Sequence, residues 1–245
     1  MNQPALKTEA PALPPRERIL AAACELFYAR GIRCVTVDDI AAAAQTNKMT
    51  LYRHFESKDL LVAEYLRTLM NYGRTRFTDA LKAHPNDPEA QLRAYIARVG
   101  EDLGRAEVRG CPITNAAVEL PEKDHPARAV IDECKCEHHA LLTKLCGDAG
   151  LKEPERLADE LCLLFEGACV DVQISGQNGP GARFTEMATA LVDSHARAGK
   201  AALHHAFRRR GGLVFGALQA GFDFSLVHLL NQFRRQGPRL LRGKR

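Results

Sequence analysis

Residues 36–55 read TVDDIAAAAQTNKMTLYRHF and contain two short helical patterns separated by a polar break. Thr36 is a favourable N-cap, and Asp39 three residues later can complete a capping box while placing negative charge in the first turn. After the break at residues 45–47, Asn47 is a second strong N-cap. This spacing predicts two short helices joined by a turn, which is the arrangement of a DNA-reading helix-turn-helix.

The second helix of this pair is expected to have one apolar face and one polar face. Leu51 and Phe55 are four residues apart and therefore share one side of the helix. A recognition helix has to pack on its own domain while it offers hydrogen-bond donors to a DNA groove, and a two-faced helix meets both needs. The polar side chains that lie away from the Leu51/Phe55 face are Lys48, Thr50, Tyr52 and Arg53.

The flanking segments predict one further helix on each side of this pair. Residues 16–27 carry an apolar stripe, and Gly31 stands where a glycine would end that helix. On the other side, Ser57 can cap a longer helix that begins near Lys58. The segment therefore predicts a small helical domain built around the helix-turn-helix.

Taken together, these residues resemble the TetR/AcrR (tetracycline repressor) family of bacterial transcriptional regulators in order and in spacing. The resemblance implies an all-α fold, with an N-terminal three-helix helix-turn-helix domain and a helical C-terminal ligand-binding and dimerisation domain. The residues that carry it are Arg18-Ile19-Leu20, Leu26-Phe27, Gly31, Thr36-Val37, Ile40-Ala41, Thr50-Leu51-Tyr52-Arg53-His54-Phe55 and Ser57-Lys58-Asp59.

The same resemblance implies a function and a set of partners. A member of this family is expected to bind a palindromic double-stranded DNA operator as a homodimer, to act as a repressor in the cytoplasm and to respond to a small-molecule effector, whose identity the sequence does not provide. The residues expected at the DNA are Thr36, Lys48, Thr50, Tyr52, Arg53, His54 and Lys58.

The turn between the two short helices departs from the family pattern at two positions. Gln45 stands where the family usually has glycine, and Thr46 stands where a small apolar residue normally packs. A residue other than glycine in a left-handed turn costs about 1 kcal/mol. We therefore expect a strained turn at Gln45.

The composition agrees with a helical protein of two domains. The chain has 245 residues, of which 46% are hydrophobic and 6% aromatic, and it lacks tryptophan. This length suits one small domain and one larger domain, and the abundance of good helix formers favours helices throughout. We expect a disordered leader at 1–12, without a secretory signal, the helix-turn-helix domain at 13–73, the helical domain at 74–200 and an atypical tail at 201–245.

In the larger domain, apolar residues recur at helical spacing between proline and glycine breaks. The string Gly110-Cys111-Pro112 with Asn115-Ala116-Ala117 resembles the C-terminal domain of one TetR subgroup. The resemblance further implies that the last two helices of this domain, near Pro154–Ser175 and Phe184–Ala196, pair with their twins in the dimer. The expected dimer stripe comprises Leu157, Leu161, Leu164, Phe165 and Ala168, opposite Met187, Leu191 and Val192.

The net charge of +4 arises from the end of the chain rather than from the helix-turn-helix. Residues 201–245 hold nine basic side chains and one acidic side chain, Asp223. This tail fits an amphipathic appendage, a basic arm on the DNA backbone or a membrane-surface segment. A membrane span is not expected, because Gln219, Asp223 and His228 interrupt its apolar run. The abrupt loss of acidic residues favours an altered reading frame with no selected role over any of these functions.

The eight cysteines indicate a reduced chain rather than a disulfide framework, because several lie beside apolar helical stretches. Residues 134–139, CKCEHH, place Cys134 with His138 and Cys136 with His139 at helical spacings. Zinc needs four ligands in a tetrahedral array, whereas adjacent helical pairs point in different directions, so we predict no metal site and no cofactor.

Two alternative functions stay open beside the DNA-binding regulator. One is a helical protein-interaction module, and the other is a metal or thiol sensor that uses Cys134, Cys136 and His138. An enzyme is not expected, because the chain has no G-x-S-x-G elbow, no phosphate-binding G-x-x-x-x-G-K loop and no H-E-x-x-H pair.

Overall fold

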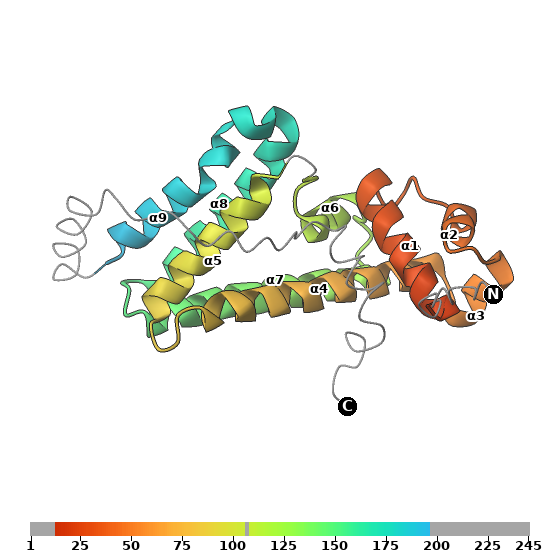
Figure 1. Ribbon diagram of the computed structural model, residues 1–245, viewed down its shortest axis with the longest axis horizontal. Helices are drawn as coiled ribbons and strands as arrows, with labels where there is room; N and C mark the ends of the chain where they lie inside the picture. The colour runs from red at the N-terminus through yellow and green to blue at the C-terminus, as the bar shows by residue number, and fades with distance from the viewer. Residues whose placement is uncertain (1–12, 106–107, 197–245) are drawn as a thin grey trace, which may run out of the picture. The chain divides into compact units, whose positions relative to one another are not determined.

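The computed structural model describes residues 13–105 and 108–196, and the predicted leader and tail lie outside these residues. The described residues are helical, as predicted, and contain no strand (Figure 1). The α-helices are α1 (Pro15–Arg30), α2 (Val37–Ala43), α3 (Lys48–His54), α4 (Lys58–Lys82), α5 (Pro88–Leu103), α6 (Pro112–Glu119), α7 (Pro126–Asp148), α8 (Pro154–Ser175) and α9 (Phe184–Ser194), with short 3₁₀ turns η1 (Gly176–Asn178) and η2 (Pro180–Arg183) before α9.

The chain divides into two compact units between Tyr65 and Leu66, inside α4. The predicted domain boundary after residue 73 also falls inside this helix. In the first unit, α1 packs on α2 and α3, and the first turns of α4 complete the core. The buried core residues of this unit include Ile19, Leu20, Ala23, Phe27, Ile32, Val35, Ile40, Leu51, Phe55, Leu61, Val62 and Tyr65.

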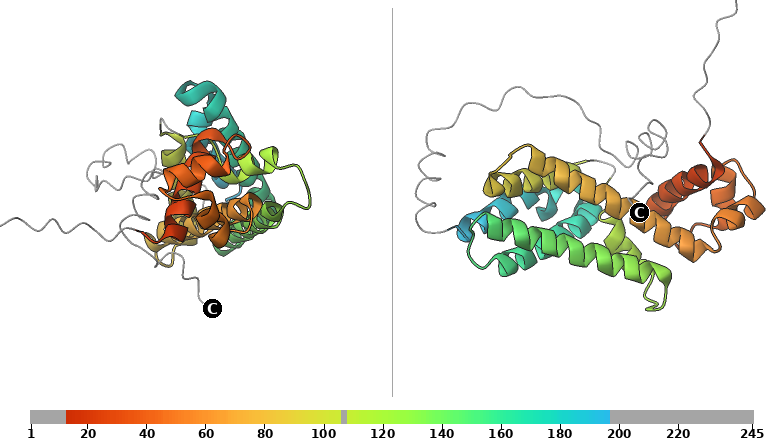
Figure 2. Two further views of the ribbon diagram at one scale, coloured as in Figure 1. Left: turned by 90° about the vertical axis from the view of Figure 1, so that its right-hand side faces the viewer. Right: turned by 90° about the horizontal axis from the view of Figure 1, so that it is seen from below.

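In the second unit, α7 packs on α5, α6 and α8, while α9 packs on α5 and α8 (Figures 1 and 2). The central side chains come from every one of the long helices, for example Leu92 of α5, Leu142 of α7 and Leu157 of α8. Five helices of the described residues begin with a proline in their first turn. Proline suits this position, because its missing N–H would have no partner inside the helix.

The segment before α6 approaches α8 so closely that it requires glycine. Gly110 has a φ of 67°, and a Cβ at this position would lie 2.9 Å from the carbonyl oxygen of Cys169. Any L-residue here would meet both a strained backbone and a backbone clash. Gly110 therefore brings Cys111 and the start of α6 against α8.

The predicted dimer stripe on α8 was wrong. Leu157, Leu161 and Ala168 are buried in the core of the second unit, and Leu164 and Phe165 pack against that core. These positions recur at helical spacing, so they form one face, and this face meets the chain's own helices. A different face of α8 is exposed to solvent: Leu163 and Ile174 are 73% and 79% exposed, and Val170 lies between them. On α9, Met187 is exposed, whereas Val192 is buried and Leu191 packs against the core.

Candidate DNA interface and internal pocket

The start of α2 has the capping box that the sequence predicted. The Thr36 hydroxyl accepts a hydrogen bond from the Asp39 backbone N–H at 3.1 Å, and the Asp39 carboxylate accepts from the Thr36 backbone N–H at 2.9 Å. Hydrogen bonds from Thr36 lower the pKa of Asp39, because they stabilise its ionised form. Thr36 itself is exposed at the N-terminus of α2.

The turn after α2 has the left-handed backbone at Gln45 that the sequence predicted. Gln45 has a φ of 51°, which is left-handed. The Thr46 N–H donates to the Ala41 carbonyl at 2.9 Å and the Gln45 N–H donates to the Ala42 carbonyl at 3.1 Å, which is the pattern of a Schellman helix end. Such an end usually places glycine where this chain has Gln45, so the turn carries backbone strain that glycine would relieve.

Helix α3 is anchored at its start and along its apolar face. The Asn47 side-chain oxygen accepts a hydrogen bond from the Thr50 N–H at 2.8 Å, which confirms the predicted N-cap. Leu51 and Phe55 are both buried, also as predicted. The Arg16 guanidinium lies 5.0 Å from the centre of the Phe55 ring, which adds a cation–π contact to this anchor. The helix is thus anchored to its own unit by one face and leaves the other face exposed.

The opposite face of α3 presents polar side chains to solvent. Lys48, Tyr52, Arg53 and His54 are exposed, and Thr50 is half-buried. Met49, which is not among the residues predicted at the DNA, is 82% exposed on this face. Its position outside the Leu51/Phe55 spacing could have identified it as solvent-facing. An exposed methionine beside these donors is an apolar surface of the kind that contacts thymine methyl groups.

Two lysines near this surface differ in how firmly they are held. Lys48 Nζ lies 3.4 Å from Asp38 Oδ2, and both side chains are exposed, so this ion pair contributes little and can exchange for a phosphate. Lys58 is half-buried, and its ammonium donates to the Ile32 carbonyl at 2.7 Å. Lys58 therefore also fixes the segment that follows α1.

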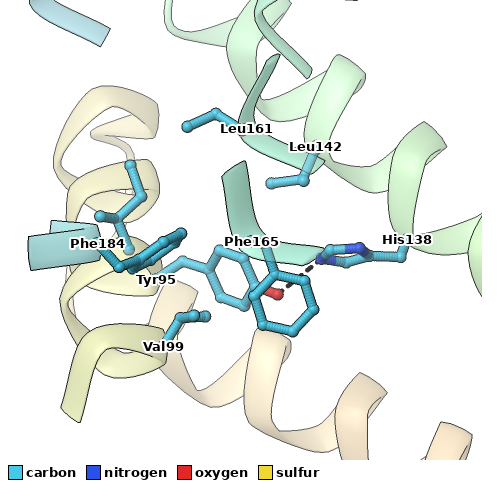
Figure 3. A pocket seen from close by; sticks show the side chains of 8 residues that line it. Tyr95, Val99, His138, Leu142, Leu161, Phe165 and Phe184 are labelled. Atoms are coloured by element: carbon cyan, nitrogen blue, oxygen red, sulfur yellow. Dashed lines mark hydrogen bonds between the residues drawn. The ribbon is translucent and has the colours of Figure 1, made fainter. Parts of the chain in front are cut away.

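The second unit contains a small apolar cavity between α5, α7, α8 and the start of α9 (Figure 3). The cavity has a volume of about 20 Å³, which is room for one or two waters. The family resemblance implied a ligand-binding domain in this part of the chain but no residues for the ligand. The lining side chains are Tyr95, Ile96, Val99, His138, Leu142, Leu161, Phe165 and Phe184.

One hydrogen bond crosses this cavity between two polar side chains. The Tyr95 hydroxyl and His138 Nε2 are 2.7 Å apart, as the dashed line in Figure 3 shows. Burial lowers the pKa of His138 to about 4, and the neighbouring Lys135 adds to this effect, so the imidazole is neutral at physiological pH. Burial also raises the pKa of Tyr95. The cavity therefore contains a neutral imidazole and a neutral phenol.

Aromatic rings continue on both sides of this pair. The Tyr95 ring centre lies 4.9 Å from that of Phe77 on α4 and 6.0 Å from that of His138. Phe165 on α8 lies 6.1 Å from His138 and 6.4 Å from Phe184 on α9. Side chains from five helices thus meet through rings in edge or tilted contact. A molecule that entered the cavity would have to displace several of these rings.

The two histidines of residues 134–139 have different partners. His138 contacts Tyr95 in the cavity, whereas His139 Nε2 lies 2.8 Å from Asp159 Oδ1 at the surface. Burial raises the pKa of Cys134 to about 11, so its thiol is largely protonated. Within residues 13–105 and 108–196 we find no group of three histidine, cysteine or acidic side chains arranged to hold a metal. Nothing here favours the alternative sensor function.

The first unit has the geometry of a helix-turn-helix DNA-binding domain, and the second is a helical domain with an internal apolar cavity. Residues 19–65 match the family described as bacterial regulatory proteins of the tetR family. Together with the relatives and structures below, this match shows that the chain belongs to the TetR family of transcriptional regulators.

Curated relatives of the chain include two named repressors. The HTH-type transcriptional repressor DhaR from Mycobacterium sp. (strain GP1) is 25% identical over 74% of this chain and 94% of its own length. The repressor KstR2 from Rhodococcus jostii (strain RHA1) is 39% identical over 33% of this chain and 39% of its own length.

The chain is also similar to solved structures. A TetR-family transcriptional regulator from Streptomyces coelicolor is 27% identical, with a TM-score of 0.70 over 75% of this chain and 96% of its own. A tetR-type regulator from Streptomyces avermitilis is 29% identical, with a TM-score of 0.65 over 74% and 98% of the two chains.

None of the helices in the described part of our chain is long and apolar enough to cross a membrane.

Proposed function

We propose that this protein is a ligand-responsive repressor that binds a palindromic operator as a homodimer through α2 and α3. The observation that carries the proposal is the division of α3 into a buried anchor and an exposed polar face. The relatives DhaR and KstR2 are named as repressors, which supports repression as the mode of regulation.

In this proposal α3 enters the major groove and α2 contacts the DNA backbone. Lys48, Tyr52 and His54 would meet the bases and nearby phosphates from the exposed face of α3, together with Thr50 and Arg53. Thr36, which is exposed at the N-terminus of α2, would contact a phosphate. Lys58 would add a phosphate contact at the start of α4.

We further propose that two chains associate through the exposed apolar face of α8 and Met187 of α9. Leu163, Val170 and Ile174 recur at helical spacing along one exposed face of α8, and apolar side chains of this size are rarely left together in water. Two-fold pairing of α8 and α9 would give a four-helix interface. The same symmetry would place two α3 helices on successive major grooves of a palindrome.

The cavity around Tyr95 and His138 is the proposed effector site. It lies in the second unit and is lined mainly by apolar side chains, as effector sites usually are. An effector releases DNA only if it favours a conformation that binds DNA less well. Couplings of about 1–3 kcal/mol change the affinity about 5- to 150-fold.

Selection of bound duplexes from random DNA, followed by binding measurements on the selected sequence, tests this function. We expect a palindromic sequence and a protein dimer on each duplex. The Lys48→Ala/Tyr52→Ala double variant should lose at least tenfold in affinity for this sequence while it keeps the wild-type helix content. Unchanged affinity of this variant, or selection of no sequence at all, would overturn the proposal.

A further inference from the structure

We propose that the effector is an uncharged, mainly apolar molecule with a hydroxyl or similar hydrogen-bonding group, and that it binds by separating Tyr95 from His138. This inference rests on the proposed function, because it names the chemical class of ligand for the same cavity. Three observations carry it: the lining of the cavity, the bond that crosses it and its small size.

The lining selects against charged ligands. None of the eight lining side chains carries a formal charge when His138 is neutral. A buried ion without a partner is strongly unfavourable, so neither a carboxylate nor an ammonium group would find compensation here. The charged residues nearest in sequence to His138 do not offer it, because Glu137 is already paired with Arg74 on α4 and Lys135 with Glu166 on α8.

The bond between Tyr95 and His138 selects for a polar group on the ligand. A molecule inserted between α5 and α7 would leave the phenol and the imidazole without partners, and an unpaired buried polar group is costly. A hydroxyl group can donate one hydrogen bond and accept another, so it can satisfy both side chains at once. A pure hydrocarbon of the same shape cannot, and it should bind more weakly.

The small size of the cavity makes ligand binding a conformational event. Space for one or two waters cannot hold an organic molecule, so the ring contacts of Phe165 and Phe184 have to open as the ligand enters. Tyr95 on α5 also contacts Phe77 on α4, and α4 is the helix that continues from the DNA-binding unit. The Tyr95–His138 bond thus acts as a latch that holds the ligand-free arrangement of α5 against α7.

A matched set of probes tests this inference on the full chain. For each of two scaffolds, benzene and naphthalene, the set comprises the parent hydrocarbon, the hydroxyl derivative, the carboxylate and the aminomethyl cation. Binding is measured by calorimetry and by the shift in melting temperature. We expect naphthol to bind about tenfold or more tightly than naphthalene. We expect naphthoate and the aminomethyl cation to leave the melting temperature unchanged.

Variants locate the binding to the latch. Tyr95→Phe and His138→Phe should each abolish the advantage of the hydroxyl probe over its hydrocarbon parent. Tyr72→Phe is the matched control, because Tyr72 belongs to the same unit but does not line the cavity. The inference is overturned if no hydroxyl probe binds, if a charged probe binds as well as its hydroxyl relative, or if both latch variants keep the preference.

Operator binding is measured in parallel without probes. If the ligand-free chain binds the selected operator but the hydroxyl probes fail, the ligand class is wrong and the repressor assignment stands. If the hydroxyl probes bind at the latch but no operator is selected, the repressor assignment is wrong and the ligand class stands.

Discussion

Arg18 on α1 donates from Nε to the carbonyl oxygen of Ala44, at the end of α2, at 3.0 Å. Its Nη2 also lies 3.4 Å from the carbonyl oxygen of the next residue, Gln45. The last carbonyls of a helix have no partner inside the helix, and a guanidinium satisfies two of them at once. Arg18 therefore stabilises the turn of the helix-turn-helix at the position where its backbone is strained.

Gln45→Gly is expected to raise the free energy of unfolding by up to about 1 kcal/mol, because glycine adopts a positive φ without steric cost. Urea unfolding monitored by circular dichroism measures the change. Ala42→Gly is the matched control: Ala42 lies within α2, where glycine should lower the free energy of unfolding by about 1 kcal/mol. Equal effects of the two substitutions would show that the turn at Gln45 is not strained.

Lys58→Ala is expected to have two separable effects. Loss of the hydrogen bond to the Ile32 carbonyl should lower the free energy of unfolding by about 1 kcal/mol. Loss of one phosphate contact should reduce the slope of log affinity against log salt by about 0.9 on duplex DNA, whatever the DNA sequence. Fluorescence anisotropy over a salt series measures the slope. Lys144→Ala removes an equal charge from α7 and should leave the slope unchanged.

Val170→Asp and Ile174→Asp should each convert the proposed dimer to monomers, because pairing would bury an unpaired carboxylate within the exposed apolar stripe of α8. Sedimentation velocity at micromolar concentration measures the change. Val118→Asp is the control, since Val118 is at 77% about as exposed as Ile174 but lies on α6. Dimers that persist in both α8 variants would assign the interface to another surface.

Acidification is expected to destabilise the second unit through His138. Its folded pKa is about 4, below the ordinary value of 6.5, so the unfolded chain binds the proton more tightly. This contribution to stability is complete above pH 6.5 and is lost as the pH falls towards 4, by roughly 3 kcal/mol in all. Lys135 and His139 lower this pKa, whereas Glu166 opposes the shift.

Urea unfolding at pH 7 and at pH 4.5 tests the contribution of His138. His138→Phe should show a smaller loss of stability between these two values than the wild type, by about 2–3 kcal/mol. His139→Gln is the control, because His139 lies at the surface beside Asp159. The same pH dependence in His138→Phe and in the wild type would contradict a neutral, buried imidazole.

The positions of the helices and of their caps follow from the sequence alone. The bonds between Thr36 and Asp39 and between Asn47 and Thr50 join residues three apart, so residue type and spacing were enough to predict them. The proline starts of α6 and α8 are local in the same way. The buried anchor of α3, Leu51 and Phe55, was predictable because four residues complete about one helical turn.

Only the tertiary structure decided which partners distant residues have. The apolar residues of α8 recur so often that the sequence supports more than one buried face, and packing on α5, α7 and α9 selected the one with Leu157 and Leu161. His138 seemed paired with Cys134 by spacing, but it meets Tyr95, 43 residues away in the sequence. Periodicity shows which side chains share a face of one helix, whereas the identity of the facing helix depends on how the whole chain folds.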